Sequence, residues 1–316
     1  MTVARGSRLS LPLRWLLTLG LLVTLLWWLD TAKLISELSR FSAGAVLLAL
    51  MVSIAQVLLS AWRWRYTAHG LGLGLSMRVA VQEYYLAMFL NQCLPGGVVG
   101  DLNRAWRHGG GSGARQTTLH AVMIERLSGQ MVMVFVALCA VVWLAAEYPA
   151  VRALFTGWGQ GVIVPALAVI LGAFFILVIG GRLWQRLRDY LATLGNDIYR
   201  GLLNSRALPL QALSSLMVVG TYLAVFAILA FNATGDAWGG EALTMLALCS
   251  LLLLAMVIPL TVAGWGVREG TAALLWPLAG FPAEQGVALS VAYGLTVLLS
   301  SLPGALFVFS RPSADH

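Results

Sequence analysis

Long apolar runs constrain this chain more than any other feature. A transmembrane helix needs about 20 consecutive apolar residues. Six segments approach or exceed this length, at approximately 11–29, 41–62, 117–146, 161–180, 209–231 and 283–309. Only 10% of the residues are charged, against about 25% in an ordinary soluble domain. The sequence therefore predicts an all-α polytopic membrane protein without a separate soluble domain.

Two shorter apolar runs, 79–94 and 242–258, each end at a break in the apolar pattern. The first break, 95–104, has the sequence PGGVVGDLNR, and the second, 259–268, has the sequence PLTVAGWGVR. In both, a glycine follows the proline by five residues and an arginine follows it by nine. Backbone at membrane depth can leave the helix only where protein or an aqueous cavity satisfies it. Each break thus predicts a re-entrant hairpin beside the six full spans, and the alternative is eight spans.

The basic residues gather on one predicted side of the membrane. All but Lys33 are arginines, and they are concentrated in the N-terminal tail and in 63–78, 96–116 and 181–208. Loops rich in arginine stay in the cytoplasm, so both termini are predicted to be cytoplasmic, in a bacterial inner membrane. The formal net charge of +7 suits anionic lipid headgroups, and nothing indicates a nucleic-acid site.

The chain also divides into two similar halves, 1–155 and 156–316, and each half contains one of the breaks. Each half would contain three spans and one hairpin, so the second half would insert upside down relative to the first. This is an inverted-topology repeat, in which the breaks meet near the bilayer midplane. Between the breaks, 182–203 carries apolar residues at helical spacing with arginines among them. That pattern predicts an amphipathic helix on the inner membrane surface.

Several ionisable residues lie inside or at the edge of the apolar segments. They are Glu83, Glu125, Arg126, Arg268 and Glu269. A charge at the centre of a membrane helix costs about 2.5–3.5 kcal/mol on insertion scales, so such residues pair or line an aqueous path. Both alternatives stay open for Glu125 and Arg126. Since Arg126 follows Glu125 directly, it points about 100° away and needs a different partner.

The breaks carry groups that suit a phosphate. Their glycines let another group approach the backbone closely, and they are Gly96, Gly97, Gly100, Gly264 and Gly266. Arg104 and Arg268 add guanidinium charges beside helix starts, where free N–H groups bind anions. Asp101 is a candidate N-cap, and Asn91 is expected to satisfy carbonyl groups that the break frees. Alternatively, the breaks only turn the chain while their arginines extend to the interface.

The sequence offers little for catalysis or metal binding. Cys93, Cys139 and Cys249 are far apart in apolar runs, and we interpret them as core residues without metal spacing or a disulfide. A single lysine also argues against P-loop and Schiff-base chemistry. No catalytic residue, metal or cofactor is therefore predicted. His120 near Glu125 is a candidate for acid–base work, which keeps a membrane-embedded lipid enzyme as one alternative.

Three motifs in order resemble the lysylphosphatidylglycerol synthase transmembrane region, a family of flippase-like domains. They are 91–104 (NQCLPGGVVGDLNR), 125–129 (ERLSG) and 264–269 (GWGVRE). In the bacterial multiple peptide resistance protein, a related domain moves aminoacylated phosphatidylglycerol between leaflets, and a separate soluble domain attaches the amino acid. These 316 residues contain no such soluble domain, so the resemblance does not imply aminoacyl transfer.

The resemblance and the breaks together imply a protein that binds or moves a phospholipid or a polyprenyl-phosphate-linked headgroup. Arg104 and Arg268 would hold the phosphate, while Glu125 and Glu269 would balance those arginines or meet a cationic headgroup. The expected partners are anionic or phosphate-bearing membrane lipids. A second alternative is an accessory protein that binds lipid, or a lipid synthase, without transporting anything.

Overall fold

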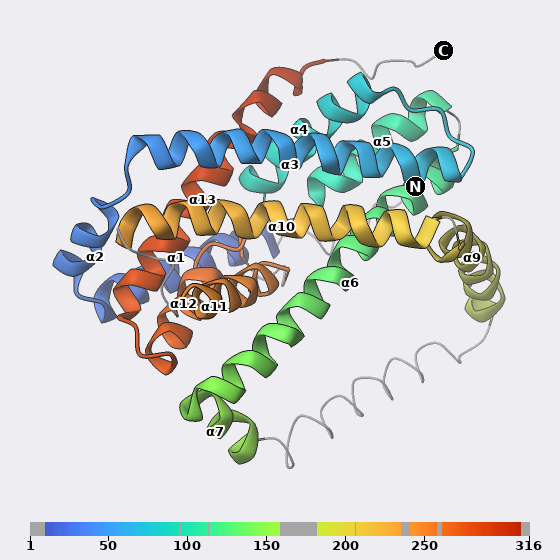
Figure 1. Ribbon diagram of the computed structural model, residues 1–316. Helices are drawn as coiled ribbons and strands as arrows, with labels where there is room; N and C mark the ends of the chain where they lie inside the picture. Colours follow the sequence, from blue (N-terminus) through green and yellow to red (C-terminus); the bar gives the residue numbers. More distant parts are fainter. Residues whose placement is uncertain are drawn as a thin grey trace.

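The computed structural model describes residues 10–94, 97–112, 114–158, 182–205, 207–234, 241–257 and 261–310. Regular structure within these ranges is helical (Figure 1), as the apolar runs predicted. The predicted span at 161–180 lies outside the described residues, and so do Pro95, Gly96 and Pro259.

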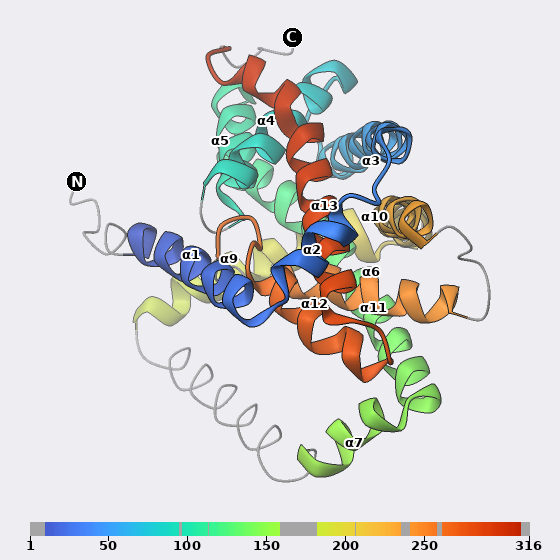
Figure 2. The same ribbon diagram turned by 90° about the vertical axis from the view of Figure 1, so that its left-hand side faces the viewer.

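Within the described ranges, four helices are long and apolar enough to cross a membrane. They are α3 (Ala43–Gly70), α6 (Arg115–Glu147), α10 (Ala207–Thr234), and α13 (Ala283–Ser301) with its 3-10 extension η3 (Leu302–Phe307). Each coincides with a predicted span. In both views α3 and α10 lie side by side, and α6 crosses them obliquely (Figures 1 and 2). The chain is therefore a multi-pass membrane protein.

A sharp bend follows the first predicted span. Helix α1 (Ser10–Trp28) and α2 (Thr31–Leu38) meet at a bend of 103° and together form a further candidate span. The bend is stabilised by Asp30, whose carboxylate accepts hydrogen bonds from the backbone N–H groups of Ala32 and Lys33 at the start of α2. The predicted span 11–29 therefore coincides with α1 alone.

Each break joins two short helices into a hairpin. The first hairpin consists of α4 (Met77–Cys93) and α5 (Val99–Ser112), and the second of α11 (Ala242–Ala255) and α12 (Val267–Leu278). At 1.5 Å per residue, the 17 residues of α4 extend about 26 Å, short of the ~30 Å hydrocarbon core. Figure 2 shows α13 running past both hairpins, with α4 near one end and α12 near the other. The lengths agree with re-entrant hairpins, while the inverted repeat, its halves and its orientation stay predictions.

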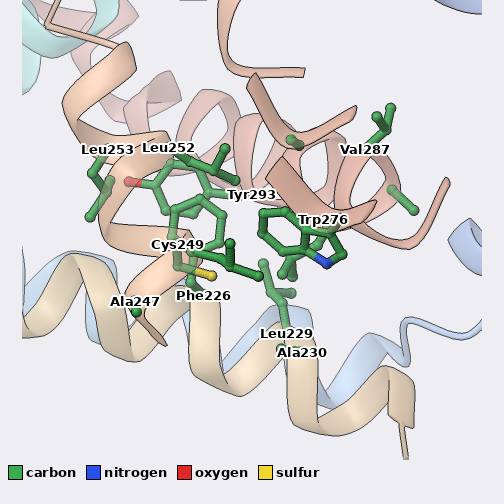
Figure 3. Packing of buried hydrophobic residues seen from close by; sticks show 14 of the residues in the cluster. Phe226, Leu229, Ala230, Ala247, Cys249, Leu252, Leu253, Trp276, Val287 and Tyr293 are labelled. Carbon is green, nitrogen blue, oxygen red and sulfur yellow. The ribbon is translucent and has the colours of Figure 1, made fainter. Parts of the chain in front are cut away.

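An apolar core fixes the second hairpin to α10 and α13. Within it the rings of Phe226 and Tyr293 stack at 3.9 Å with 4° between their planes. Trp276 of α12 and Cys249 of α11 are buried in the same cluster (Figure 3). Of the three cysteines, Cys249 alone is a core residue, because Cys93 and Cys139 are exposed.

The predicted amphipathic segment is helical, as α9 (Arg182–Ile198) and a π-helical turn (Tyr199–Leu203). Its C-terminal part packs on protein, since Leu202 is buried and Ile198 is partly buried in a cluster that includes Ile124 of α6. At the opposite end of α6, α7 spans Pro149–Trp158.

Candidate functional site

Glu125 lies at the centre of a buried ion-pair network inside the helical bundle. The carboxylate has no exposed surface. Its Oε1 accepts a hydrogen bond of 3.1 Å from Arg63 Nε and a second from Arg63 Nη2, and its Oε2 accepts one of 2.7 Å from Arg104 Nη2. Arg63 Nη1 also donates to Ser215 Oγ at 3.0 Å. The network thereby connects α3, α5, α6 and α10.

Arg63 is the member of this network that the sequence misplaced. The predicted span ended at residue 62, which put Arg63 in a cytoplasmic loop, but α3 continues to Gly70. A polar stripe along α3 could have revealed this, because its members recur at helical spacing. They are Ser53, Gln56, Ser60, Arg63 and Thr67, all of them buried. A stripe of this kind indicates a helix face turned toward protein rather than lipid.

Arg104 is fully buried and held from several sides. Besides Glu125, its guanidinium binds Asp101 Oδ1, with Nε at 3.0 Å and Nη2 at 2.8 Å. It also lies over the rings of Trp64 and Tyr84, at 4.8 Å and 4.6 Å from their centroids. Of the neighbouring tyrosines Tyr84 and Tyr85, Tyr84 is the one whose ring lies against the Arg104 guanidinium.

Asp101 and Arg126 form the second part of the network. Arg126 Nη1 donates to Asp101 Oδ2, and both its terminal nitrogens donate to the Gly97 carbonyl at 3.3 Å. Asn91 Nδ2 donates to the same Asp101 oxygen at 3.0 Å. Arg126 thus has a partner other than Glu125, as its position on α6 predicted. Asp101 lies within the first turn of α5 rather than at its N-cap.

The glycines of the breaks shape the backbone. A Cβ on Gly100 would lie 1.9 Å from the Ala87 carbonyl oxygen, so only glycine allows α5 to pack this closely on α4. Gly97, Gly264 and Gly266 adopt φ angles of 59°, 79° and 85°, which favour glycine. The expected free N–H groups are partly occupied. Gly100 N donates to Asn91 Oδ1 at 2.8 Å, and Gly266 N donates to Glu269 Oε2 at 2.7 Å.

The second break repeats the arrangement around its own arginine. Arg268 binds Glu269 Oε1 through Nη2 at 2.6 Å and Ser290 Oγ through Nε at 2.7 Å. Its guanidinium lies over the rings of Trp265 and Tyr293, at 5.1 Å and 5.4 Å. Each break arginine therefore contacts a carboxylate, a tryptophan and a tyrosine.

Glu83 forms a separate pair at the far side of the first hairpin. Both its carboxylate oxygens accept hydrogen bonds of 2.9 Å from Arg107 Nε. Arg107 Nη1 donates in turn to the Ser310 carbonyl at 2.9 Å. The pair attaches the first hairpin to the end of the chain segment that follows α13.

A polar cavity of about 270 Å³ lies beside the network, between the two hairpins. Arg63, Asp101, Glu125 and Arg126 form its charged wall. The remaining lining residues come from α3, α4, α6, α10, α13 and the end of α11, and they are Gln56, Tyr84, Ala87, Met88, Asn91, Gly129, Gln130, Met133, Val218, Val219, Tyr222, Leu253, Met256, Val257 and Tyr293. The first break reaches this cavity through Asp101, and the second hairpin reaches it through the end of α11, whereas Arg104 and Arg268 do not line it.

An apolar groove of about 370 Å³ opens on the other side of the Asp101–Arg126 pair. It runs between α5, α6 and α9. Its lining is mostly aliphatic, with Val98, Leu102, Leu119, Val122, Met123, Ile124, Leu127, Leu194 and Ile198. Asp101, Arg126 and Gln130 line both the groove and the cavity.

His120 belongs to the contact between α6 and α9. Its Nδ1 lies 2.6 Å from Asp197 Oδ2, and its ring meets Tyr190 edge-on. The residues described here contain no cluster of three or more histidine, cysteine, aspartate or glutamate side chains arranged to hold a metal ion.

Comparison with protein families matches residues 15–304 to the lysylphosphatidylglycerol synthase TM region. Comparison with curated proteins and with solved structures gives no significant match. The matched region includes both breaks, the buried network and the cavity, and it extends over most of the chain. The chain therefore belongs to the family of the lysylphosphatidylglycerol synthase transmembrane region.

Proposed function

We propose that this protein carries a phosphate-bearing lipid headgroup between the two leaflets of a bacterial inner membrane, with both termini in the cytoplasm. One observation supports this most strongly. A polar cavity with a charged wall lies among helices that are long and apolar enough to span a membrane, and residues of both hairpins line it. Charged groups at that depth are expensive to bury and commonly mark a transport path.

Arg126 is our candidate for the direct phosphate contact. Its side chain is 32% exposed and borders the cavity, whereas Arg104 and Arg268 are buried against partners within the chain. The sequence had assigned phosphate binding to these two arginines. We propose instead that they are positioning residues, which hold each hairpin to the helices around it.

The two hairpins are the elements that we expect to move. Each is joined by a glycine-rich break and meets the cavity from a different half of the chain. Small changes at such hinges can open a site to alternate sides. The headgroup would then cross within the cavity while its acyl chains stay in lipid or in the apolar groove.

A leaflet-resolved assay in proteoliposomes tests the proposal. Fluorescent phosphatidylglycerol and phosphatidylethanolamine with identical chains are incorporated, and dithionite reports the outer-leaflet fraction. We expect wild-type protein to exchange at least one of them faster than protein-free vesicles do. Arg126→Gln should slow that exchange about tenfold, since a hydrogen bond to a charged group contributes about 1.5–3 kcal/mol.

The matched control is Arg40→Gln, because Arg40 forms an exposed pair with Glu37 and does not line the cavity. Size-exclusion profiles and melting temperatures establish that both variants are folded. Wild-type exchange no faster than that of empty vesicles would refute the transport proposal, and wild-type exchange no faster than that of Arg126→Gln would refute the role of Arg126.

A further inference from the structure

The buried network beside the cavity has an excess of one positive charge. Its cations are the guanidinium groups of Arg63, Arg104 and Arg126, and its anions are the carboxylates of Asp101 and Glu125. Three positive charges thus face two negative ones. Two other buried pairs of arginine and glutamate, Glu83–Arg107 and Arg268–Glu269, are each balanced.

The excess charge is least compensated at Arg126. The side chains of Arg63 and Arg104 are 5% and 1% exposed and both bind the fully buried Glu125. Arg126 instead shares Asp101 with Arg104 and Asn91, and its side chain is 32% exposed. An anion that enters the cavity would therefore meet the most exposed guanidinium of the network at this position.

The same guanidinium borders the apolar groove between α5, α6 and α9. A ligand bound at Arg126 can consequently place a charged group in the cavity and a hydrocarbon chain in the groove. A soluble phosphodiester would use the first region only. The two regions are adjacent, since Asp101, Arg126 and Gln130 line both, and this favours a lipid.

We infer that the cavity and the groove form one amphipathic site for a lipid whose headgroup carries a single net negative charge. The phosphodiester contacts Arg126 from the cavity, and one acyl chain lies in the groove. A cationic aminoacylated headgroup would add to the excess positive charge and is disfavoured. This inference rests on the proposed function for the identity of the site, and it specifies the charge class of the lipid.

Binding to the purified full chain in detergent, followed by native mass spectrometry, tests the charge preference. Phosphatidylglycerol, phosphatidylethanolamine and lysyl-phosphatidylglycerol with identical acyl chains are the probes. We expect phosphatidylglycerol to bind more tightly than the cationic lysyl-phosphatidylglycerol, by a factor of about ten or more. Arg126→Gln should remove most of this preference, and Arg40→Gln should retain it. Equal binding of the two lipids to wild-type protein, or an unchanged preference in Arg126→Gln, would overturn the inference.

A second pair of variants tests the groove. Met123→Trp fills it from an exposed position on α6, and Met131→Trp adds the same bulk to exposed surface on the same helix, outside both regions. Met123→Trp should weaken phosphatidylglycerol binding severalfold, while Met131→Trp leaves it unchanged. Glycerophosphoglycerol, which has no acyl chains, should bind far more weakly than the lipid. Equal affinity for the lipid and its free headgroup, or full lipid binding in Met123→Trp, would overturn the placement of the chain.

The two hypotheses fail separately. A charge preference in binding without any leaflet exchange would refute transport and support the charge-selective site. Leaflet exchange without a charge preference would support transport and refute the charge-selective site.

Discussion

Asp101 and Arg126 form an ion pair on the wall that the polar cavity and the apolar groove share. Asp101 is a residue of the first hairpin, and Arg126 belongs to the long helix α6. Because Asn91 and Arg104 bind the same carboxylate, the pair connects both arms of the hairpin to α6. An anion that competes for Arg126 would weaken this connection, which is how ligand binding could change the position of the hairpin.

Replacing Glu125 by glutamine should destabilise the fold strongly. The substitution leaves two buried guanidinium groups, those of Arg63 and Arg104, without the charge that they share. Breaking a buried pair in this way costs about 3–5 kcal/mol. The measurement is the free energy of unfolding in detergent.

Glu37→Gln is the matched control for this change. It removes a carboxylate from a surface pair with Arg40, whose side chain is 52% exposed, and should cost about 1 kcal/mol or less. Similar losses for the two variants would contradict a structural role of the buried network.

Replacing Gly100 by alanine should separate the two helices of the first hairpin. The added Cβ would lie 1.9 Å from the Ala87 carbonyl oxygen, so the backbone must move, at a cost of about 1–3 kcal/mol. Gly110→Ala on the same helix meets no atom within 4 Å and should be neutral or stabilising by about 0.5–1 kcal/mol. Thermal unfolding of both variants gives the comparison. A neutral Gly100→Ala would show that the hairpin is more loosely packed than described.

The sequence predicted the described spans well because membrane thickness sets a minimum apolar length. The same rule found the short arms α4 and α11 and marked their ends at the two breaks. It failed at Arg63, because a charged residue was taken to end a span. The Arg63 side chain in fact belongs to a buried polar face of α3, whose polar residues recur every three to four positions.

The partners of the charged residues could be predicted only in part. That Arg126 needs a partner other than Glu125 follows from the helical rotation alone. Two further facts depend on how α3, α5 and α6 pack together. They are that this partner is Asp101 and that Glu125 lies between Arg63 and Arg104. Asn91 illustrates the same limit, since it binds an N–H group and a carboxylate where carbonyl partners were expected.

Cysteine labelling should decide between re-entrant hairpins and eight spans. Gly74→Cys precedes α4 and Gly110→Cys lies near the end of α5, and both positions are exposed. If the first hairpin is re-entrant, a membrane-impermeant maleimide should label both from the same side of oriented vesicles. Glu147→Cys, at the far end of α6, should be labelled from the other side. Cys93 and Cys139 are replaced beforehand, while Cys249 is buried and can remain. Labelling of 74 and 110 from opposite sides would favour eight spans.

Replacing His120 by alanine should loosen α9 and thereby open the apolar groove. His120 Nδ1 lies 2.6 Å from Asp197 Oδ2, and its ring contacts Tyr190, so the side chain holds α9 against α6. Loss of a hydrogen bond to a charged group should speed amide exchange in 190–203 about tenfold. His69→Ala is the control, because His69 is exposed and bonds only within its own helix among the described contacts. Since α9 supplies one wall of the groove, His120→Ala should also weaken phosphatidylglycerol binding. Unchanged amide exchange in α9 would show that other contacts hold this helix against α6. Any effect of His120→Ala on lipid binding would then have a cause other than movement of α9.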